Sequence, residues 1–417
     1  MPLPSSQLRI FLVDSIGAYR GMHYYSFALG AALAQEDVNV TLLSTPETAV
    51  HAWKPDNLSV KGVFRHIYGK QPKWLRGLWY GWALLQIAWL AWREKPEIVH
   101  WHFYQIPFLD RFLLWWLKRL HIVLVATVHD VVPLTFGPLA RVKNTRRYKA
   151  LYALSDGLIA HSHQALVSLG GLDASLPAKT VLTPLGHYLH VAGRAGDKVE
   201  ARQRLGFAAN EPLILVFGSI KPNKRLDWAI ETLSDVVKIF PSARLVVVGQ
   251  PQDQTVTPFV ALAEESGVAD RVYWHLDVVE DALLLLYFAA ADVIFFPYEW
   301  IYQSAALVMA MSFGQPVVAT AVGGNKELVL PGKTGVLVTP GDIGEMGQAL
   351  IDLLGDREKA RQMGQAAREY VSTALSWEQI ALETRQYYLQ LFAEKVNASP
   401  LTSPTRRTSL SSSKINN

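Results

Sequence analysis

Short apolar runs alternate with longer apolar or amphipathic stretches along most of the chain, which is the pattern of a parallel α/β protein. In the first half, the short runs predict strands at residues 8–13, 38–43, 98–101, 123–128, 158–160 and 181–182. In the second half, they predict strands at residues 213–217, 244–248, 272–275, 293–296, 316–321 and 335–338. Each half therefore predicts a doubly wound sheet with helices between its strands.

A polar stretch at residues 188–210 separates the two halves and indicates a boundary between domains. We expect one domain at residues 1–190, a second at 191–375, and a C-terminal helix at 376–396 that could pack back on the first domain. Residues 397–417 are rich in Ser, Thr and Asn and have little to bury, so they predict a disordered tail.

The stretch from Ala291 to Gly324 combines a buried strand, a loop at 297–303, a helix that begins at Ser304, and a second buried strand. The Ser304 hydroxyl can cap free N–H groups of that helix. A capped helix start beyond the carboxyl end of a parallel strand is where α/β proteins bind anions. A plain βαβ unit that binds nothing explains this stretch equally well.

A second loop carries cationic residues. Gly218 ends a buried strand, and Lys221 and Lys224 follow in the loop before the next helix. Two ammonium groups in such a loop suit a pyrophosphate. Lysines that only cover the surface are the commoner alternative.

The first domain has weaker signals. Gly17 and Gly21 follow the first strand and could let the backbone approach a ligand, but no GxGxxG or GxxxxGK[ST] motif is present. His129 follows a strand directly and so lies at the edge where parallel sheets bind ligands, although a lone histidine is more often structural. His161 and His163 have no carboxylate at a suitable spacing, so we predict no metal site.

Residues 61–149 are rich in tryptophan and in basic residues. Eight of the 13 tryptophans lie between Trp74 and Trp116, and the segment from Arg141 to Lys149 has five basic residues and no acid. Aromatic, basic helices suit an anionic membrane surface. Core-facing helices with Trp as packing bulk are the main alternative, and a membrane span is a third, since the apolar run is just too short.

Composition narrows the class of protein. Residues 1–195 have 20 Lys and Arg against 11 Asp and Glu, a balance of +9, which favours an acidic partner for the first domain. A solvated basic face is the alternative. The absence of cysteine excludes disulfides and thiolate metal sites and fits a reducing compartment. The N-terminal residues run straight into a strand, so we expect no signal peptide.

Five segments of the chain match known motifs. The segment GSIKPNKRLD at 218–227 resembles G-x-I-[RK]-P-x-K-G-x-D, and AMSFGQPVVAT at 310–320 resembles A-M-A-x-G-x-P-V-V-A-T. Residues 323–327 (GGNKE), 332–338 (GKTGVLV) and 127–130 (TVHD) resemble G-G-x-x-E, G-x-x-G-x-L-V and T-x-H-D. Together these segments resemble glycosyltransferase family 4, the retaining nucleotide-sugar transferases of the GT-B fold, over about residues 8–395.

The resemblance implies two Rossmann-like domains that face each other across a cleft, with the donor held mainly by the second domain and the acceptor mainly by the first. It implies no metal ion and no cofactor, because the nucleoside diphosphate sugar is a co-substrate. The donor-binding residues would be Gly17, Gly218, Lys221, Lys224, Ser304 and Ala305, and His129 would contact the sugar.

One departure affects the expected chemistry. The family has two glutamates eight positions apart, one on the donor sugar and one on the ribose, and this chain has Ile301 and Met309 there. Glu299 could replace the first from the loop. Pro297, Tyr298 and Ser304 also look like the PY-x-x-x-x-x-S pattern of the family's broader group.

The sequence thus predicts a retaining hexosyltransferase for cell-surface polysaccharide or glycolipid synthesis, with His129 and Glu299 as its catalytic candidates. We expect a glycan or lipid-linked acceptor, a cytoplasmic location at the inner face of the cell membrane, a membrane contact through residues 61–149, and no nucleic-acid partner. The alternatives are a catalytically inactive binding or scaffold protein of the same fold, and a nucleotide-sugar epimerase.

Overall fold

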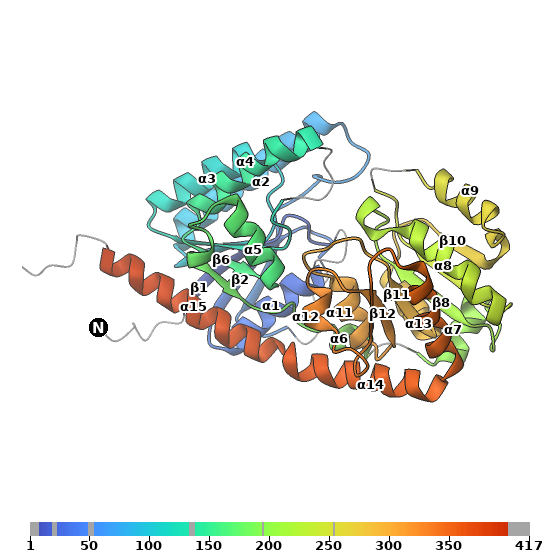
Figure 1. The fold of residues 1–417 in the computed structure, drawn as a ribbon. Helices are drawn as coiled ribbons and strands as arrows, with labels where there is room; N and C mark the ends of the chain where they lie inside the picture. Colours follow the sequence, from blue (N-terminus) through green and yellow to red (C-terminus); the bar gives the residue numbers. More distant parts are fainter. Residues whose placement is uncertain are drawn as a thin grey trace, which may run out of the picture.

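The computed structural model describes residues 8–18, 23–48, 54–132, 138–193, 196–252 and 255–398. Within these residues the chain forms two fully parallel sheets with helices around each, so the predicted α/β class with two doubly wound sheets is confirmed (Figure 1). The predicted tail lies almost entirely outside the described residues, as does Gly21.

The first sheet has seven strands in the order β3-β2-β1-β4-β5-β6-β7. They are β1 (Arg9–Val13), β2 (Asn39–Ser44), β3 (Leu58–Gly62), β4 (Ile98–Trp101), β5 (Val123–Val128), β6 (Gly157–Ala160) and β7 (Thr180–Leu182). The helices of this half are α1 (His23–Gln35), α2 (Lys73–Glu94), α3 (Pro107–Arg119), α4 (Pro138–Leu154), α5 (His163–Leu172) and the short α6 (Leu189–Ala192).

The second sheet has six strands in the order β10-β9-β8-β11-β12-β13. They are β8 (Leu213–Phe217), β9 (Arg244–Val248), β10 (Val272–His275), β11 (Val293–Phe296), β12 (Val317–Thr320) and β13 (Val336–Val338). Its helices are α7 (Lys198–Leu205), α8 (Leu226–Ile239), α9 (Thr257–Glu265), α10 (Asp281–Ala290), α11 (Ala305–Ser312), α12 (Asn325–Leu328), α13 (Ile343–Gly355) and α14 (Arg357–Ala374). The last helix, α15 (Trp377–Ala398), packs on the first half. The predicted domain boundary at 190/191 falls between the two sheets, in α6.

One strand, β3, was missed in the sequence. Its residues, LSVKG, form no continuous apolar run, because β3 lies at the edge of the sheet and only Leu58 is fully buried. An edge strand needs less apolar surface than a central strand such as β5, whose six residues are all buried.

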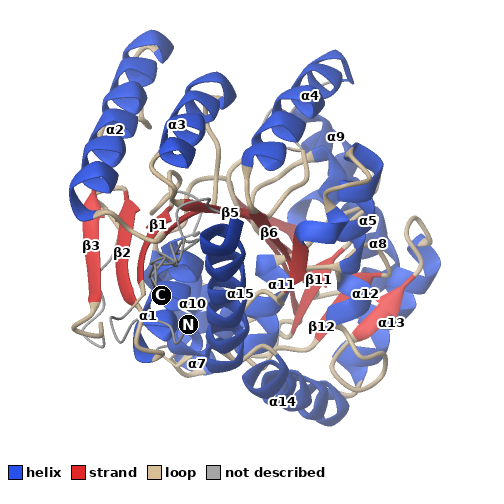
Figure 2. Cartoon of the chain, turned by 90° about the vertical axis from the view of Figure 1, so that its left-hand side faces the viewer, coloured by secondary structure: helices blue, strands red, loops and turns tan. Residues whose placement is uncertain are grey.

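The two faces of the first sheet carry different helices (Figure 2). Successive side chains of a strand point to opposite faces. One set packs with residues of α2, α3 and α4, whereas the other packs with residues of α1 and α15. The outer layer is held together in part by a hydrogen bond from Tyr80 of α2 to Asp110 of α3.

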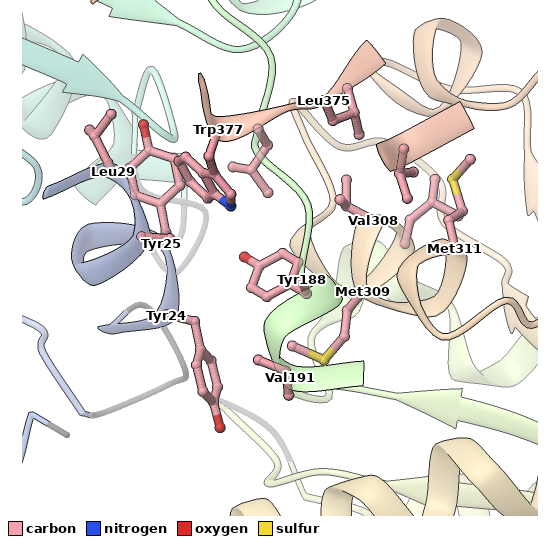
Figure 3. Packing of buried hydrophobic residues seen from close by; sticks show 14 of the residues in the cluster. Tyr24, Tyr25, Leu29, Tyr188, Val191, Val308, Met309, Met311, Leu375 and Trp377 are labelled. Atoms are coloured by element: carbon pink, nitrogen blue, oxygen red, sulfur yellow. The ribbon is translucent and has the colours of Figure 1, made fainter. Parts of the chain in front are cut away.

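The C-terminal helices connect the two halves of the molecule. Helix α14 packs against α11 in the second half, and α15 then returns to pack against α1 and β5 in the first (Figure 1). At the crossing, the Trp377 indole donates a hydrogen bond to the carbonyl of His187 and its ring contacts Tyr25 (Figure 3). A Cβ added at Gly186 would lie 2.4 Å from the Trp377 ring, so the close approach of this helix requires glycine there.

A buried hydrogen bond anchors the far part of α15. The hydroxyl of Tyr388 lies 2.6 Å from Nδ1 of His100 in β4, and both residues are fully buried. The other ring nitrogen of His100 lies 2.6 Å from the hydroxyl of Thr127 in β5. Removing one partner would leave a buried polar atom without a hydrogen bond.

We therefore expect Tyr388→Phe to lower the free energy of unfolding by about 1–3 kcal/mol, because Nδ1 of His100 loses its partner. Denaturant titration followed by tryptophan fluorescence measures this loss. Tyr370→Phe is the matched control, since the Tyr370 hydroxyl has no hydrogen bond among the described residues and is half-buried. An equal loss in both variants would contradict the anchoring role of Tyr388.

Candidate active site

Helix α11 begins with an open, capped end. Ser304 has an extended backbone (φ −120°, ψ 99°), and its Oγ accepts a hydrogen bond from the amide of Leu307 at 3.1 Å. The amides of Ala305 and Ala306 precede the first hydrogen-bonded turn, so the helix has no internal acceptor for them. The start of α11 therefore has the polarity that attracts an anion.

The two-lysine loop is joined to this helix start by backbone hydrogen bonds. The amide of Glu299 donates to the carbonyl of Asn223 at 2.9 Å, and the Asn223 side chain donates to the carbonyl of Trp300 at 3.0 Å. Pro222 to Lys224 form one 3-10 turn. The loop after β8 and the loop before α11 therefore form one unit.

Lys224 lies inside this unit. Its Nζ is 5.3 Å from the centre of the Tyr298 ring and would be 2.7 Å from a Cβ at Gly218. Gly218 has φ +109°, so the glycine both permits this backbone and leaves room for the ammonium group. Burial lowers the pKa of Lys224 to about 8. Without an anionic partner, the lysine therefore loses its proton more easily than an exposed lysine does.

Lys221 faces the first domain instead. Burial raises the pKa of Asp130, and the charge of nearby Lys221 partly opposes that rise. Asp130 follows His129 at the carboxyl end of β5. The two lysines thus have different surroundings: Lys224 lies against its own domain, and Lys221 lies close to the opposite domain.

His129 lies in an aromatic layer. Its ring stacks on Phe103 with centroids 4.5 Å apart and meets the edge of Tyr25 at 5.0 Å. Burial lowers the pKa of His129 well below the usual range, so its ring is neutral near pH 7. Its Nε2 is buried and has no hydrogen-bond partner among the described residues.

The other predicted site residues, Glu299 and Gly17, make no contact with Lys224 or His129 among the described contacts. Glu299 is more than half exposed and its carboxylate lies 3.7 Å from Arg225, so it has no contact with Lys224 or His129 among the contacts resolved. Gly17 has φ +54°, and its amide donates to Asp14 at 2.9 Å. A Cβ at Gly17 would lie 2.4 Å from Oγ1 of Thr45, so this turn after β1 also requires glycine.

The two positions that depart from the family pattern belong to the core. Ile301 and Met309 are each less than a tenth exposed. Met309 points toward Tyr188 and Val191 of the connection between the domains (Figure 3). A carboxylate there would be buried among apolar groups, which is costly without a partner.

The two domains meet beside this unit. Ser162, the N-cap of α5, donates to the carbonyl of Tyr302 at 2.8 Å. The amide of His163 donates to the carboxylate of Glu327 at 2.9 Å, and the His163 ring lies 3.0 Å from the same carboxylate. These contacts place the carboxyl end of β6 in the first domain next to the loop before α11.

Sequence reasoning missed His102, and it gave His161 no role beyond a rejected metal site. Each directly follows a strand, as His129 does, and that repeated position could have revealed them. Burial lowers the pKa of His102 to about 3 and that of His161 to about 4. Among the described residues, no group of three or more side chains is arranged to hold a metal ion.

Comparisons with known proteins identify the family to which the chain belongs. A model of the group 1 glycosyl transferases matches residues 197–370, and a model of glycosyltransferase family 4 matches residues 19–172. The chain belongs to the family 4, group 1 glycosyltransferases. The hexosyltransferase class expected from the sequence agrees with this family.

The chain aligns with about two thirds of the length of the curated relatives that it matches. The D-inositol 3-phosphate glycosyltransferase of Nocardia farcinica is 29% identical over 305 residues, which is 68% of this chain and 65% of the relative. That of Segniliparus rotundus is 31% identical over 304 residues, which is 70% of this chain and 65% of the relative.

Solved structures agree with the GT-B fold. Sucrose-phosphate synthase from Thermosynechococcus elongatus aligns with a TM-score of 0.73 at 24% identity, covering 93% of this chain and all of that one. HepE from Anabaena in complex with UDP and glucose aligns with a TM-score of 0.71 at 19% identity, covering 92% of this chain and all of that one. The predicted GT-B architecture is therefore confirmed.

The buried histidines predict an acid-sensitive fold. His161 has a pKa of about 4 in the folded chain, below the value of about 6.5 for an unfolded histidine. Between pH 6.5 and pH 4 the His161 side chain is therefore protonated in the unfolded chain but neutral in the folded chain. The contribution of His161 to stability is complete above pH 6.5 and is lost as the pH falls toward 4.

Between pH 6.5 and pH 4.5 we expect wild-type protein to lose about 1 kcal/mol per pH unit more stability than His161→Asn loses. Denaturant titrations at several pH values measure the two slopes. His163→Asn serves as the control, because the His163 side chain is largely exposed. Equal slopes for wild type and His161→Asn would contradict a buried, neutral His161.

Proposed function

We propose that this protein transfers a sugar, with retention of configuration, from a nucleoside diphosphate sugar to a hydroxyl group of an acceptor. The observation that carries the proposal is the single unit formed by Lys224 and the open start of α11. An ammonium group and free helix amides in two loops that are hydrogen bonded to each other suit the two charges of a diphosphate. The Anabaena neighbour was solved with UDP-glucose, which fits such a donor.

The chemistry follows from that charge arrangement. The bond between the anomeric carbon and the diphosphate oxygen breaks, and a bond from the acceptor oxygen to the same carbon forms. The acceptor proton passes to the departing phosphate oxygen. Negative charge grows on the diphosphate as the sugar becomes cationic, so Lys224, Lys221 and the α11 amides of Ala305 and Ala306 stabilise the transition state.

In this proposal, the first domain contributes contacts to the transferred sugar. His129 is neutral and half-buried, so it can hydrogen bond to a sugar hydroxyl but does not carry charge. Glu299, on the exposed edge of the loop, would have to leave Arg225 to reach the sugar, so it contributes less in this proposal than the sequence suggests. Gly17 holds the turn after β1 close to the same sheet edge.

We further propose that the acceptor is a glycan or lipid-linked glycan at the inner face of the cell membrane. One face of α2 carries six large apolar side chains at helical spacing, each more than half exposed: Trp74, Leu78, Trp82, Leu85, Trp89 and Trp92. Helix α3 adds Phe108, Phe112 and Trp115. Core packing accounts for the opposite face of α2 but not for this one.

Basic residues surround this apolar face. Arg93 and Arg119 lie over the rings of Trp89 and Trp115, at 5.0 and 3.8 Å from their centres. Helix α4, beside α3, adds the exposed Arg146 and Arg147 (Figure 2). Tryptophan among basic groups matches the interface of an anionic bilayer. None of the described helices is long and apolar enough to cross a membrane.

A catalytically inactive binding protein is the second candidate, because Ile301 and Met309 leave no carboxylate at the expected positions. Consumption of a nucleotide sugar by the purified protein separates the two candidates. The names of the curated relatives indicate a cyclitol phosphate acceptor for those proteins, which favours a transferase that uses a hydroxyl-rich acceptor.

Lys224 predicts a pH-dependent affinity for nucleoside diphosphates. A bound diphosphate favours the charged lysine, so binding is tightest below the pKa of about 8 and weakens above it. Calorimetric titration with UDP should show affinity falling by about fivefold between pH 8 and pH 9. Lys224→Arg, which stays charged, should remove that fall. A wild-type affinity independent of pH would contradict the role of Lys224.

The apolar face predicts membrane binding. The double variant Trp82→Gln/Trp89→Gln should reduce sedimentation with anionic vesicles by about tenfold, because it removes two interfacial rings. Val167→Gln is the control, since Val167 is 70% exposed on α5. Sedimentation of the double variant at the wild-type level would contradict a membrane contact through α2.

A further inference from the structure

The loop before α11 lies between the two domains and packs with both. Tyr302 is buried in an apolar cluster whose other buried members all come from the first domain, and half-buried Trp300 packs against the same cluster. Ile301, between them, belongs to the cluster that contains α11. Neighbouring side chains of this loop are therefore held by different parts of the molecule.

A hydroxyl group of the first domain holds the backbone of this loop. Oγ of Ser162 donates a hydrogen bond to the carbonyl of Tyr302 at 2.8 Å and accepts one from the amide of Ala165 at 3.2 Å. A hydroxyl group can do both, because it has one proton and two lone pairs. Ser162 is 2% exposed, so water has little access to either bond. One side chain thus caps α5 and holds the loop of the opposite domain.

Glu327 of α12 contacts the same helix start. The amide of His163 donates to both carboxylate oxygens of Glu327, at 2.9 and 3.2 Å, and Nδ1 of His163 lies 3.0 Å from one of them. The first amides of a helix have no partner within it, and a helix start favours negative charge. Glu327 therefore caps α5 from the second domain.

The carbonyl of Tyr302 joins three segments. Besides the Ser162 hydroxyl, it accepts a hydrogen bond from the amide of Gly324 at 3.2 Å. A Cβ at Gly324 would lie 2.6 Å from this carbonyl oxygen, so the close approach requires glycine. The loop before α11, the start of α12 and the start of α5 therefore meet at one backbone group.

The residues that contact the first domain also connect the two parts of the proposed diphosphate site. The Asn223 side chain, in the two-lysine loop, donates to the carbonyl of Trp300 at 3.0 Å. Ser304, two residues after Tyr302, is the N-cap of α11. A displacement of Trp300 and Tyr302 would therefore move the α11 start relative to the Lys224 loop.

From these contacts we infer that Trp300, Ser162 and Glu327 are positioning residues, through which the first domain holds the donor site of the second domain in its binding geometry. They act through the loop and not by contact with the nucleotide. The Glu327 and His163 side chains are 35% and 76% exposed, so water can replace this ion pair and the domains can separate reversibly. Separation releases the loop, and a released loop lowers the affinity for a diphosphate. The inference rests on the proposed function, in which a nucleoside diphosphate binds at Lys224 and the α11 start.

The test removes the contacts of the loop with the first domain. Trp300→Ala removes packing, and Ser162→Asp removes the hydrogen bond to Tyr302 while keeping a good cap for α5. Trp79→Ala is the matched control, because half-buried Trp79 packs against the same cluster from within the first domain. Ser162→Thr is the conservative variant, since it keeps the hydroxyl group.

We expect the double variant Trp300→Ala/Ser162→Asp to raise the Kd for UDP by about tenfold, because the fraction of molecules with an anchored loop falls to about a tenth. Trp300→Ala/Ser162→Thr should bind UDP more tightly than this double variant. Trp79→Ala should lower the melting temperature but keep the wild-type Kd. Calorimetric titration with UDP and thermal melting curves measure these effects.

Hydrogen exchange monitors the loop without any ligand. In the double variant, the amides of residues 299–306 should exchange faster than in wild type and in Trp79→Ala, whereas those of β8 should be unchanged. UDP should in turn slow exchange of the His163 amide in wild type, because the coupling between two sites is reciprocal.

A wild-type Kd in the double variant, or an equal rise in Trp79→Ala, would overturn the inference. Unchanged exchange at residues 299–306 in the double variant would overturn it as well. A wild-type protein that does not bind UDP would instead contradict the proposed function, and the exchange of residues 299–306 would then decide the positioning role alone.

Discussion

The return of helix α15 from the second domain to the first is the constraint on which the arrangement of this molecule depends. A transferase built from two separate sheets needs their carboxyl edges held close to each other. Here Trp377 fixes the crossing against Gly186 and Tyr25, and Tyr388 hydrogen bonds to His100 in the middle of the first sheet. Trp377 contacts Tyr25 of α1, and Tyr388 contacts His100, whose ring lies beside that of His102. The helix that joins the domains therefore also packs against the buried histidines of the first domain.

The two domains give the candidate site different electrostatic environments. The second domain gathers positive charge, because Lys224 lies against Tyr298 in the loop before α11 and Lys221 lies close to Asp130 of the other domain. The first domain gathers neutral acceptors, because burial keeps His102, His129 and His161 without charge. A diphosphate is stabilised by the first environment, and an uncharged group such as a sugar hydroxyl is compatible with the second. A nucleoside diphosphate sugar and its acceptor contain both kinds of group.

The sequence predicted the architecture well, because buried parallel strands produce continuous apolar runs that are easy to recognise. The exception was β3, whose edge position requires no such run. The sequence also indicated the Lys224 loop and the α11 start as candidate binding segments, because the glycine, lysine and serine there are clear local signals. The hydrogen bonds from Glu299 and Asn223 that join them cross 76 residues or more of chain and have no local signal. The same limit applies to His102, His129 and His161, which are neighbours only through strand order.

The claim that a diphosphate is held between Lys224 and the start of α11 is tested most directly by a structure of the protein with bound UDP. The account predicts phosphate oxygens within hydrogen-bond distance of the amides of Ala305 and Ala306 and of Nζ of Lys224, with both backbone loops unchanged. Phosphates bound elsewhere on the protein, or a Lys224 side chain still against Tyr298 and without contact to UDP, would contradict it.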